Sequence, residues 1–209
     1  MLEILYEDNH MIVFNKPAGL ATQPSLHHEE ALETLAKEFI KVRDKKPGAV
    51  YLHAIHRIDA PVSGVVVFAK TSKALSRLQK SIRDKTVYKC YVGWVEGILK
   101  KKEGTLRHFM LHGEHRALQG GDKEALLSYK VLKEENGNSQ LEILLDTGRY
   151  HQIRAQFSWI GHPLLGDVKY GSTKSWPQGI ALHHREFRIP HPITKEELTF
   201  IAPFRTAWK

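Results

Sequence analysis

Two periodicities divide the 209-residue chain into strands and helices. Apolar runs and two-residue alternation predict strands over residues 2–4, 11–14, 65–69, 86–95, 106–111, 125–131, 141–145, 180–189 and 198–201. Helical spacing predicts helices over residues 29–43, from a cap at Thr71 or Ser72, and from about residue 149 to a glycine cap at Gly161. We therefore expect an α+β fold, a mixed and largely antiparallel sheet with helices packed on it.

The strand predicted over residues 86–95 has one face for a core and one for a cleft. The core face carries Tyr88, Cys90, Val92 and Trp94. On the other face are Lys89 and Tyr91, with Gly93 expected to leave room beside them. Further along, a polar stretch through residues 120–122 is predicted to be a mobile loop.

Composition and charge narrow the class of protein. The length fits a single domain over residues 1–209, and the single Cys90 excludes an internal disulfide or a multi-cysteine zinc site. No apolar run is long enough to cross a membrane and residues 1–15 are too acidic for a secretory signal, so we expect a cytoplasmic protein. The net charge of +8 is compatible with a nucleic-acid partner but does not require one.

The first candidate for chemistry is Asp59, which lies between the cation Arg57 and a Pro61, Ser63, Gly64 turn at the start of a predicted strand. A half-buried carboxylate costs stability unless it is paired. These residue types are also ordinary turn formers. The local pattern alone leaves a plain turn and a reactive carboxylate both open.

Several cations have two interpretations as well. Lys16 precedes a turn and can be a solvated residue or a phosphate contact. Arg154 follows His151 and Tyr150 at helical spacing, so the three are expected to be neighbours on a helix surface, where an exposed arginine is the ordinary interpretation. One helix face carries Lys73, Arg77, Lys80 and Arg83. His112, His115 and Arg116 could contact RNA.

Two blocks of sequence resemble the RluA-type pseudouridine synthases. His56-Arg57-Ile58-Asp59 with Ser63-Gly64 is similar to the catalytic-loop motif of that family, and the run 147–154 with Gly161-His162-Pro163 is similar to its second signature. Lys16-Pro17 with Gly19, Lys89 with Tyr91, and Ala181-Leu182-His183 also fit in order. The chain departs at Ile58, Val62 and Tyr150, where relatives usually carry Leu, Thr and Thr.

The resemblance implies a pseudouridine synthase fold with a central cleft and a role for each matching residue. Asp59 is the catalytic carboxylate, Tyr91 lies against the uracil, and Arg154 pairs with the aspartate. Arg57, with His56 beside it, displaces the target base, while Leu182 and Ile58 pack the site. The reaction neither gains nor loses atoms, so one carboxylate suffices where a glycoside hydrolase usually needs two, and no cofactor is expected.

Three functions stay open on the sequence. The first is an enzyme that isomerises uridines in structured RNA, either tRNA or ribosomal RNA, and that needs no obligate protein partner. In this case the helix with the four cations would bind the RNA backbone. The second is a basic RNA-binding protein or RNA chaperone on the same fold. The third is a metal hydrolase using pairs such as His27-His28, His112 with His115, or His183-His184, but their spacing does not suit a metal site, so none is predicted.

Overall fold

The computed structural model describes residues 2–25, 29–204 and 208. Contacts divide the chain into two compact units: unit 1 consists of Met1–Val87 and His184–Pro203, and unit 2 of Tyr88–His183 and Phe204–Lys209. Each unit has its own strands and helices, which are described separately below. A single domain over residues 1–209 stays a prediction, because two compact units can belong to one domain.

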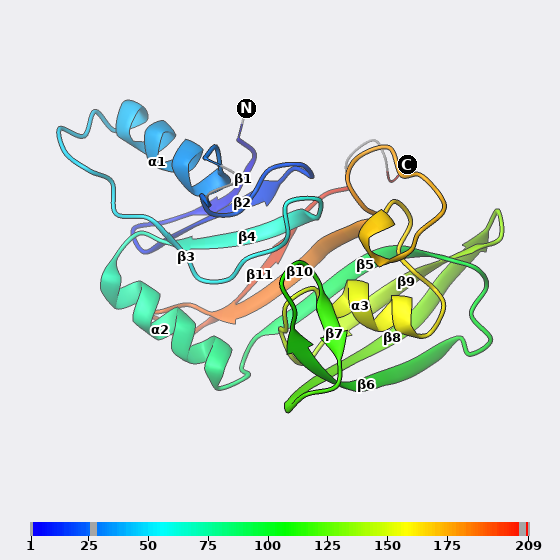
Figure 1. Cartoon of the computed structure of the whole chain (residues 1–209). Coiled ribbons are helices and arrows are strands. Elements are labelled where there is room, and N and C mark those ends of the chain that lie inside the picture. Colours follow the sequence, from blue (N-terminus) through cyan, green and yellow to red (C-terminus); the bar gives the residue numbers. More distant parts are fainter. Residues whose placement is uncertain (1, 26–28, 205–207, 209) are drawn as a thin grey trace. The chain divides into compact units, whose positions relative to one another are not determined.

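Unit 1 is a sheet in which β1–β2, β2–β4, β3–β4 and β10–β11 are antiparallel pairs (Figure 1), and its strands β2 and β4 are fully buried. Its strands are β1 (Ile4–Glu7), β2 (Met11–Lys16), β3 (His53–Ala54), β4 (Ser63–Ala69), β10 (Leu182–Pro190) and β11 (Glu197–Ile201). They run in the order β1-β2-β4-β10, while β3 pairs with β4 and β11 with β10. Burial of every residue of β2 and β4 explains why their sequences are continuous apolar runs rather than alternating ones.

Two helices pack on unit 1 at the positions that the spacing predicts. They are α1 (Leu32–Arg43) and α2 (Ser72–Arg83), and α2 begins where the Thr71 hydroxyl accepts a 3.1 Å hydrogen bond from the Ala74 amide. Ala74 and Leu78 of α2 pack in one apolar cluster with side chains of β2 and β4. Phe14, on the opposite face of β2, lines a pocket with side chains of α1.

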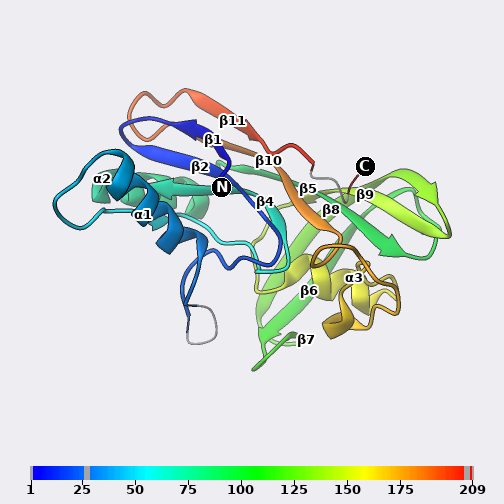
Figure 2. The ribbon, with the colours of Figure 1, turned by 90° about the horizontal axis from the view of Figure 1, so that it is seen from above.

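Unit 2 is an antiparallel sheet with one α-helix, α3 (Gln152–Trp159), and a short 3₁₀ helix, Val168–Tyr170, in its described residues. The strands are β5 (Tyr88–Glu96), β6 (Glu103–His112), β7 (Ala117–Gln119), β8 (Lys123–Glu135) and β9 (Asn138–Leu145), in the order β5-β9-β8-β6-β7 (Figures 1 and 2). Asn136 and Gly137 both have positive φ, as a tight two-residue hairpin requires. The α+β prediction with a largely antiparallel sheet is therefore confirmed.

Two local predictions for unit 2 are wrong, and one strand was not predicted. Residues 120–122 do form a loop, but it follows the unpredicted strand β7, which pairs with β6. Both faces of β5 are buried from Cys90 to Val95, and its two edges hydrogen-bond to β9 and to residues 163–165 and 181. Gly93 leaves no room, since a Cβ there would lie 3.1 Å from Leu164 Cδ2 and 3.2 Å from the Ala181 carbonyl oxygen.

The start of the last helix also differs from the prediction. Helix α3 begins at Gln152, so Tyr150 lies outside it, and His151 adopts a left-handed conformation with φ of 52° as its N-cap. The i to i+4 relation expected between Tyr150 and Arg154 therefore does not exist. Gly161 does follow the helix with φ of 81°, as predicted for its C-terminal cap.

Candidate active site

The Asp59 segment of unit 1 is a turn. The Val62 amide donates a 3.0 Å hydrogen bond to the Asp59 carbonyl oxygen, and β4 starts at Ser63. Asp59 is half-buried and Arg57 is exposed. The turn interpretation of this stretch is thus correct as far as the backbone goes, and it places the carboxylate at the entrance of a buried strand.

Lys16, at the end of β2, stabilises this turn through hydrogen bonds of its side chain. Its side chain is fully buried, and its Nζ donates to the carbonyl oxygens of Pro17 at 2.9 Å, Leu20 at 2.5 Å and Ala60 at 3.2 Å. The Gly19 amide donates to the same Ala60 oxygen at 2.8 Å. Lys16 is therefore neither a solvated turn residue nor exposed to a phosphate: it ties the turn after β2 to the residue next to Asp59.

Burial lowers the pKa of Lys16 to about 7, and the neighbouring Asp59 carboxylate opposes that shift. An ammonium that is removed from water loses hydration, which favours the neutral amine. The three carbonyl oxygens and the Asp59 charge together replace part of this lost hydration. Lys16 and Asp59 are thus electrostatically coupled members of one site.

Thr22 fixes the other side of the Asp59 segment. Its hydroxyl donates to the Ile58 carbonyl oxygen at 2.8 Å and lies 3.3 Å from the Ile58 amide nitrogen, so both backbone groups of the residue before Asp59 contact one side chain. Thr22 is buried, as is Ile58, which is 6% exposed. Sequence reasoning missed Thr22, since nothing in the local pattern connects residue 22 with residue 58.

Gly64 is the residue on which the chain enters β4. Its φ is +118°, and a Cβ there would lie 2.2 Å from the His184 carbonyl oxygen. His184 Nδ1 also lies 2.8 Å from the carbonyl oxygen of Val65, a contact that requires a proton on that nitrogen. Because both conformation and close approach demand glycine, Gly64 sets the angle at which the Asp59 turn meets the sheet.

The two residues before Ile58 differ in how the fold uses them. His56 Nε2 lies 3.3 Å from the Val67 amide, which donates to it, and the ring stacks on Phe187 with centroids 4.8 Å apart. Arg57 is exposed. The ring contacts give His56 a part in anchoring the loop, while the base-displacing roles predicted for Arg57 and His56 stay predictions.

Unit 2 holds Arg154, on α3, in a buried ion pair. Its Nε donates to Asp167 Oδ2 at 2.7 Å and its Nη2 to Asp167 Oδ1 at 2.9 Å. The side chains of Arg154 and Asp167 are 6% and 1% exposed. The expectation of an exposed helical arginine is therefore wrong. A pairing of Arg154 with Asp59 stays a prediction.

Two further residues of the predicted site, Tyr91 and Leu182, are buried on strands. Tyr91 on β5 is 7% exposed and Leu182 at the start of β10 is 4% exposed. Burial lowers the pKa of Lys89, two residues before Tyr91, and Asp146 opposes that shift. Tyr91, Leu182 and Arg154 belong to unit 2, whereas Asp59, Arg57, His56 and Ile58 belong to unit 1.

The basic face of α2 belongs to unit 1. Lys73, Lys80 and Arg83 are exposed, whereas Arg77 is half-buried and its Nη1 donates to the Pro192 carbonyl oxygen at 3.0 Å. Lys80 also pairs with Asp84 on the same helix. Three of the four cations can thus reach a solvent-borne polyanion, while Arg77 is partly used by the fold.

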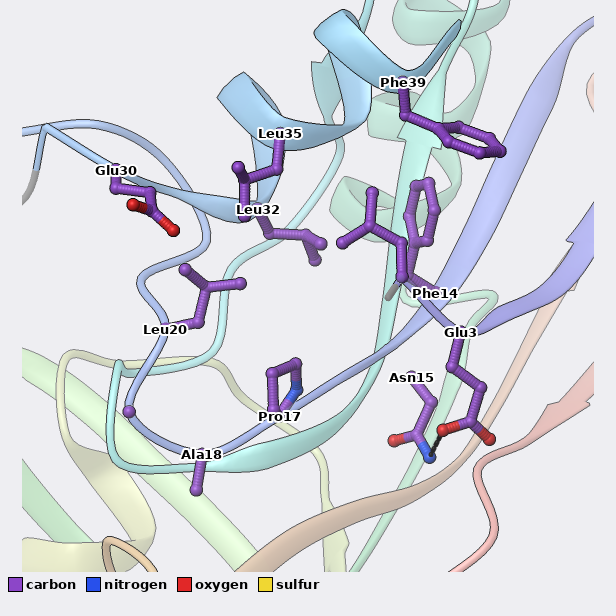
Figure 3. A pocket seen from close by; sticks show the side chains of 12 residues that line it. Glu3, Phe14, Asn15, Pro17, Ala18, Leu20, Glu30, Leu32, Leu35 and Phe39 are labelled. Atoms are coloured by element: carbon purple, nitrogen blue, oxygen red, sulfur yellow. Dashed lines mark hydrogen bonds between the residues drawn. The ribbon is translucent and has the colours of Figure 1, made fainter. Parts of the chain in front are cut away.

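A pocket of about 600 Å³ borders the turn that Lys16 stabilises (Figure 3). Its walls are mostly apolar and include Phe14, Leu32 and Leu35, which point toward one another. The charged residues lining it are Glu3 and Glu30, and Glu3 accepts a 3.1 Å hydrogen bond from Asn15 Nδ2. A pocket with acidic and apolar walls does not suit a phosphate backbone, so it is not the RNA site.

The histidine pairs considered for a metal site do not form one in the described residues. Among these, no group of three or more His, Cys, Asp or Glu side chains has an arrangement that could hold a metal ion. His27 and His28 lie outside the described residues. In the part of the chain that is described, no helix is both long and apolar enough to cross a membrane.

Comparison with known proteins identifies the class of protein. The model of the RNA pseudouridylate synthase family matches residues 10–159, which include Asp59, Tyr91 and Arg154. The chain belongs to this family, whose members are isomerases that modify RNA. The resemblance of the two sequence motifs to RluA-type enzymes is therefore confirmed over most of the chain.

Particular relatives support the same assignment. The chain is 36% identical to the uncharacterized RNA pseudouridine synthase YhcT of Bacillus subtilis, over 97% of this chain and 68% of that protein. It is 32% identical to the dual-specificity RNA pseudouridine synthase RluA of Haemophilus influenzae, over 96% of this chain and 92% of that protein. The solved human RNA pseudouridylate synthase domain containing 4 has the same fold, with a TM-score of 0.81 and 22% identity over 98% of this chain and 89% of that one.

Proposed function

We propose that this chain converts specific uridines of structured RNA to pseudouridine, with Asp59 as the essential carboxylate. The observation that carries the proposal is the support built around one acid: Lys16, Thr22 and Gly64 fix the backbone on both sides of Asp59. Such support is expected of a residue that must be held in a productive position. Membership of the RNA pseudouridylate synthase family supports assigning this chemistry to the acid.

The reaction breaks the bond between the uracil nitrogen and the ribose, turns the base, and joins the ribose to a ring carbon. The proton on that carbon is lost, and a proton returns to the freed nitrogen, so the atoms balance without a co-reactant. In our proposal Asp59 attacks or abstracts a proton as a carboxylate, and the Arg154 guanidinium favours its charged form. Tyr91 lies against the uracil, and Leu182 and Ile58 pack around it.

The target uridine is stacked or paired in folded RNA and must be flipped out, at a cost of a few kcal/mol. We propose that Arg57 fills the gap, because its exposed planar guanidinium can stack and carry charge. His56 would assist by holding the loop. The exposed cations of α2, Lys73, Lys80 and Arg83, would contact the RNA backbone. Replacing them with glutamine should make the slope of log K for RNA binding against log salt concentration shallower, by about 0.7–0.9 for each phosphate contact that is lost.

The target is tRNA or ribosomal RNA in this proposal, which would place the enzyme in the cytoplasm. The names of relatives leave both open: the Haemophilus protein is called dual-specificity, and a 30% identical protein of Pseudomonas aeruginosa is named ribosomal large subunit pseudouridine synthase D. Carbodiimide treatment and primer extension on RNA from cells with and without the gene would find the modified uridines.

The decisive experiment compares wild type with Asp59→Asn on RNA that was labelled with 5-tritiated uridine in cells lacking the gene. The wild type should release tritium, because the isomerisation frees the proton at that carbon, and Asp59→Asn should release none above background. Asp122→Asn is a matched control, since Asp122 is an exposed aspartate of unit 2. A wild-type rate in Asp59→Asn would overturn the mechanism, while RNA binding with no tritium release by the wild type would favour the RNA-binding alternative.

A further inference from the structure

Unit 2 contains a column of three aromatic rings that the proposed chemistry does not use. His112, at the end of β6, stacks on Tyr150 with centroids 4.1 Å apart and an angle of 29° between the ring planes. Tyr150 stacks on His151 at 3.8 Å and 21°. Tyr150 is thus the middle ring, and the exposed His112 is the outer one.

The inner end of the column is anchored in the core of unit 2. His151 Nδ1 lies 3.0 Å from the Tyr170 hydroxyl oxygen, which accepts a 2.8 Å hydrogen bond from the Ala117 amide. Tyr170 is buried, and burial raises its pKa to about 12, so it stays neutral. A ring held in this way loses little conformational entropy when a ligand stacks on the column.

The same anchor connects the column to the proposed catalytic machinery. The Arg154 guanidinium lies over the Tyr170 ring, with its carbon 5.1 Å from the ring centroid. Tyr170 therefore contacts Arg154 as well as His151. A nucleotide stacked on His112 would therefore be connected to Arg154 through the contacts of Tyr150, His151 and Tyr170.

The surroundings of His112 favour an RNA base over other flat ligands. Arg116, in the turn after His112, and Arg149, next to Tyr150, are both exposed cations. Of the acids nearby, Glu124 pairs with Arg107, while Glu114 is exposed. An exposed ring flanked by arginines is the usual site for an unpaired base, whose π-face stacks while the phosphates meet the cations.

We propose that His112 is the outer surface of a stacking platform for an unpaired base of the RNA, a different nucleotide from the uridine that is isomerised. The proposal rests on the proposed function, because it assumes that RNA is the substrate. The platform would favour RNAs in which a loop contains a second unpaired base, besides the target uridine, that is turned out of the base stack. It therefore acts on substrate choice and not on the chemical step.

The test uses the Asp59→Asn protein, so that RNA binds without turnover, and a five-nucleotide RNA with 2-aminopurine between uridines as the probe. Stacking should quench the 2-aminopurine fluorescence. His112→Ala should weaken binding about 5- to 100-fold and abolish the quenching, because one base loses its aromatic partner. His112→Phe should stay within about twofold of the parent, because it keeps a ring.

Two controls separate stacking from charge and from misfolding. His115→Ala removes a histidine of the same turn that is not in the column, so any loss of binding should be smaller than in His112→Ala and the quenching should be kept. Because His112 is exposed, His112→Ala should also keep the parent's unfolding midpoint. The salt dependence of binding should be equal in parent and His112→Ala, since no phosphate contact is lost.

The outcomes for the platform and for the enzyme are distinct. Equal binding by the parent and His112→Ala, or equal losses in His112→Ala and His115→Ala, would overturn the platform even if Asp59 proved essential. With Asp59 intact, His112→Ala should raise KM for tritium release and leave kcat within about twofold. If the wild type bound and quenched the probe but never released tritium, the platform would stand and the proposed function would fall.

Discussion

Among the described residues, each unit buries one lysine or arginine side chain, and the two units stabilise it in different ways. In unit 1 the Lys16 ammonium donates to three neutral carbonyl oxygens, of Pro17, Leu20 and Ala60. In unit 2 the Arg154 guanidinium donates twice to a single carboxylate, that of Asp167. The first arrangement solvates a charge with backbone dipoles, and the second neutralises it.

The difference follows from the chemistry of the two side chains. A guanidinium stays charged even when buried, and its planar edge matches a carboxylate in a bidentate contact. An ammonium can give up its proton, so burial without a full counter-charge lowers the pKa of Lys16 to about 7. Arg154 is therefore a fixed positive charge, whereas Lys16 is a backbone clamp whose charge depends on its surroundings. Removing the partner should be far more damaging for the arginine.

The largest expected effect is that of Asp167→Asn. It removes the Asp167 carboxylate from the buried Arg154 charge, which should cost about 3–5 kcal/mol of unfolding free energy. Urea denaturation followed by circular dichroism measures it. The double variant Arg154→Met with Asp167→Leu removes both charges and should lose less than Asp167→Asn alone. A loss below about 1 kcal/mol in the single variant would show that Asp167 is not the main partner of the charge.

Lys16→Met should have the next largest effect. The substitution leaves buried carbonyl oxygens without their donor but also removes the cost of burying an ammonium, so the net loss should be about 1–3 kcal/mol. Tritium release should fall as well, mainly in kcat, because the turn next to Asp59 loses its tie to β2. Lys46→Met, at an exposed lysine, is the control and should change neither quantity. If Lys16→Met kept full activity, Lys16 would not be needed to position the turn next to Asp59.

The pH dependence of stability separates the two cations directly. The unfolded chain keeps Lys16 protonated up to its ordinary pKa of 10.5, whereas the folded chain releases that proton near pH 7. Between these values the unfolded state binds more protons, so the contribution of Lys16 to stability rises with pH, by about 1 kcal/mol per pH unit. The stability difference between wild type and Lys16→Met, measured from pH 6.5 to 9, should shift in favour of the wild type. A flat difference would mean that Lys16 stays charged when folded.

Local signals were enough to predict most elements of both units. The buried strand β4 follows from its apolar run, α2 from the Thr71 cap, and the β8–β9 hairpin from Asn136-Gly137. The candidate residues around Asp59 also follow, because the family motif is continuous in sequence. These features depend on neighbours within a few positions along the chain.

The partners of the buried charges could not be predicted in the same way. Lys16 is buried because its acceptors include Ala60, 44 positions away, and Thr22 reaches Ile58 across 36 positions. Asp167 belongs to the loop after α3, 13 positions from Arg154, where helical spacing gives no information. Because of such tertiary contacts, Lys16 and Arg154 are buried, although the local sequence predicts a solvated lysine and an exposed arginine.

The smallest effect is expected where a cation is not buried at all. Asp84→Asn removes the partner of Lys80 on α2, and the two side chains are 46% and 68% exposed. Water already solvates both charges, so the loss should be about 0.3–0.5 kcal/mol by urea denaturation and should shrink further in 0.5 M salt. If Asp84→Asn lost as much unfolding free energy as Lys16→Met, burial would not explain the different contributions of Lys80 and Lys16 to stability. RNA binding should not weaken in Asp84→Asn. The variant removes a negative charge beside the exposed cations of α2, so this surface becomes more positive, which favours binding of a phosphate backbone.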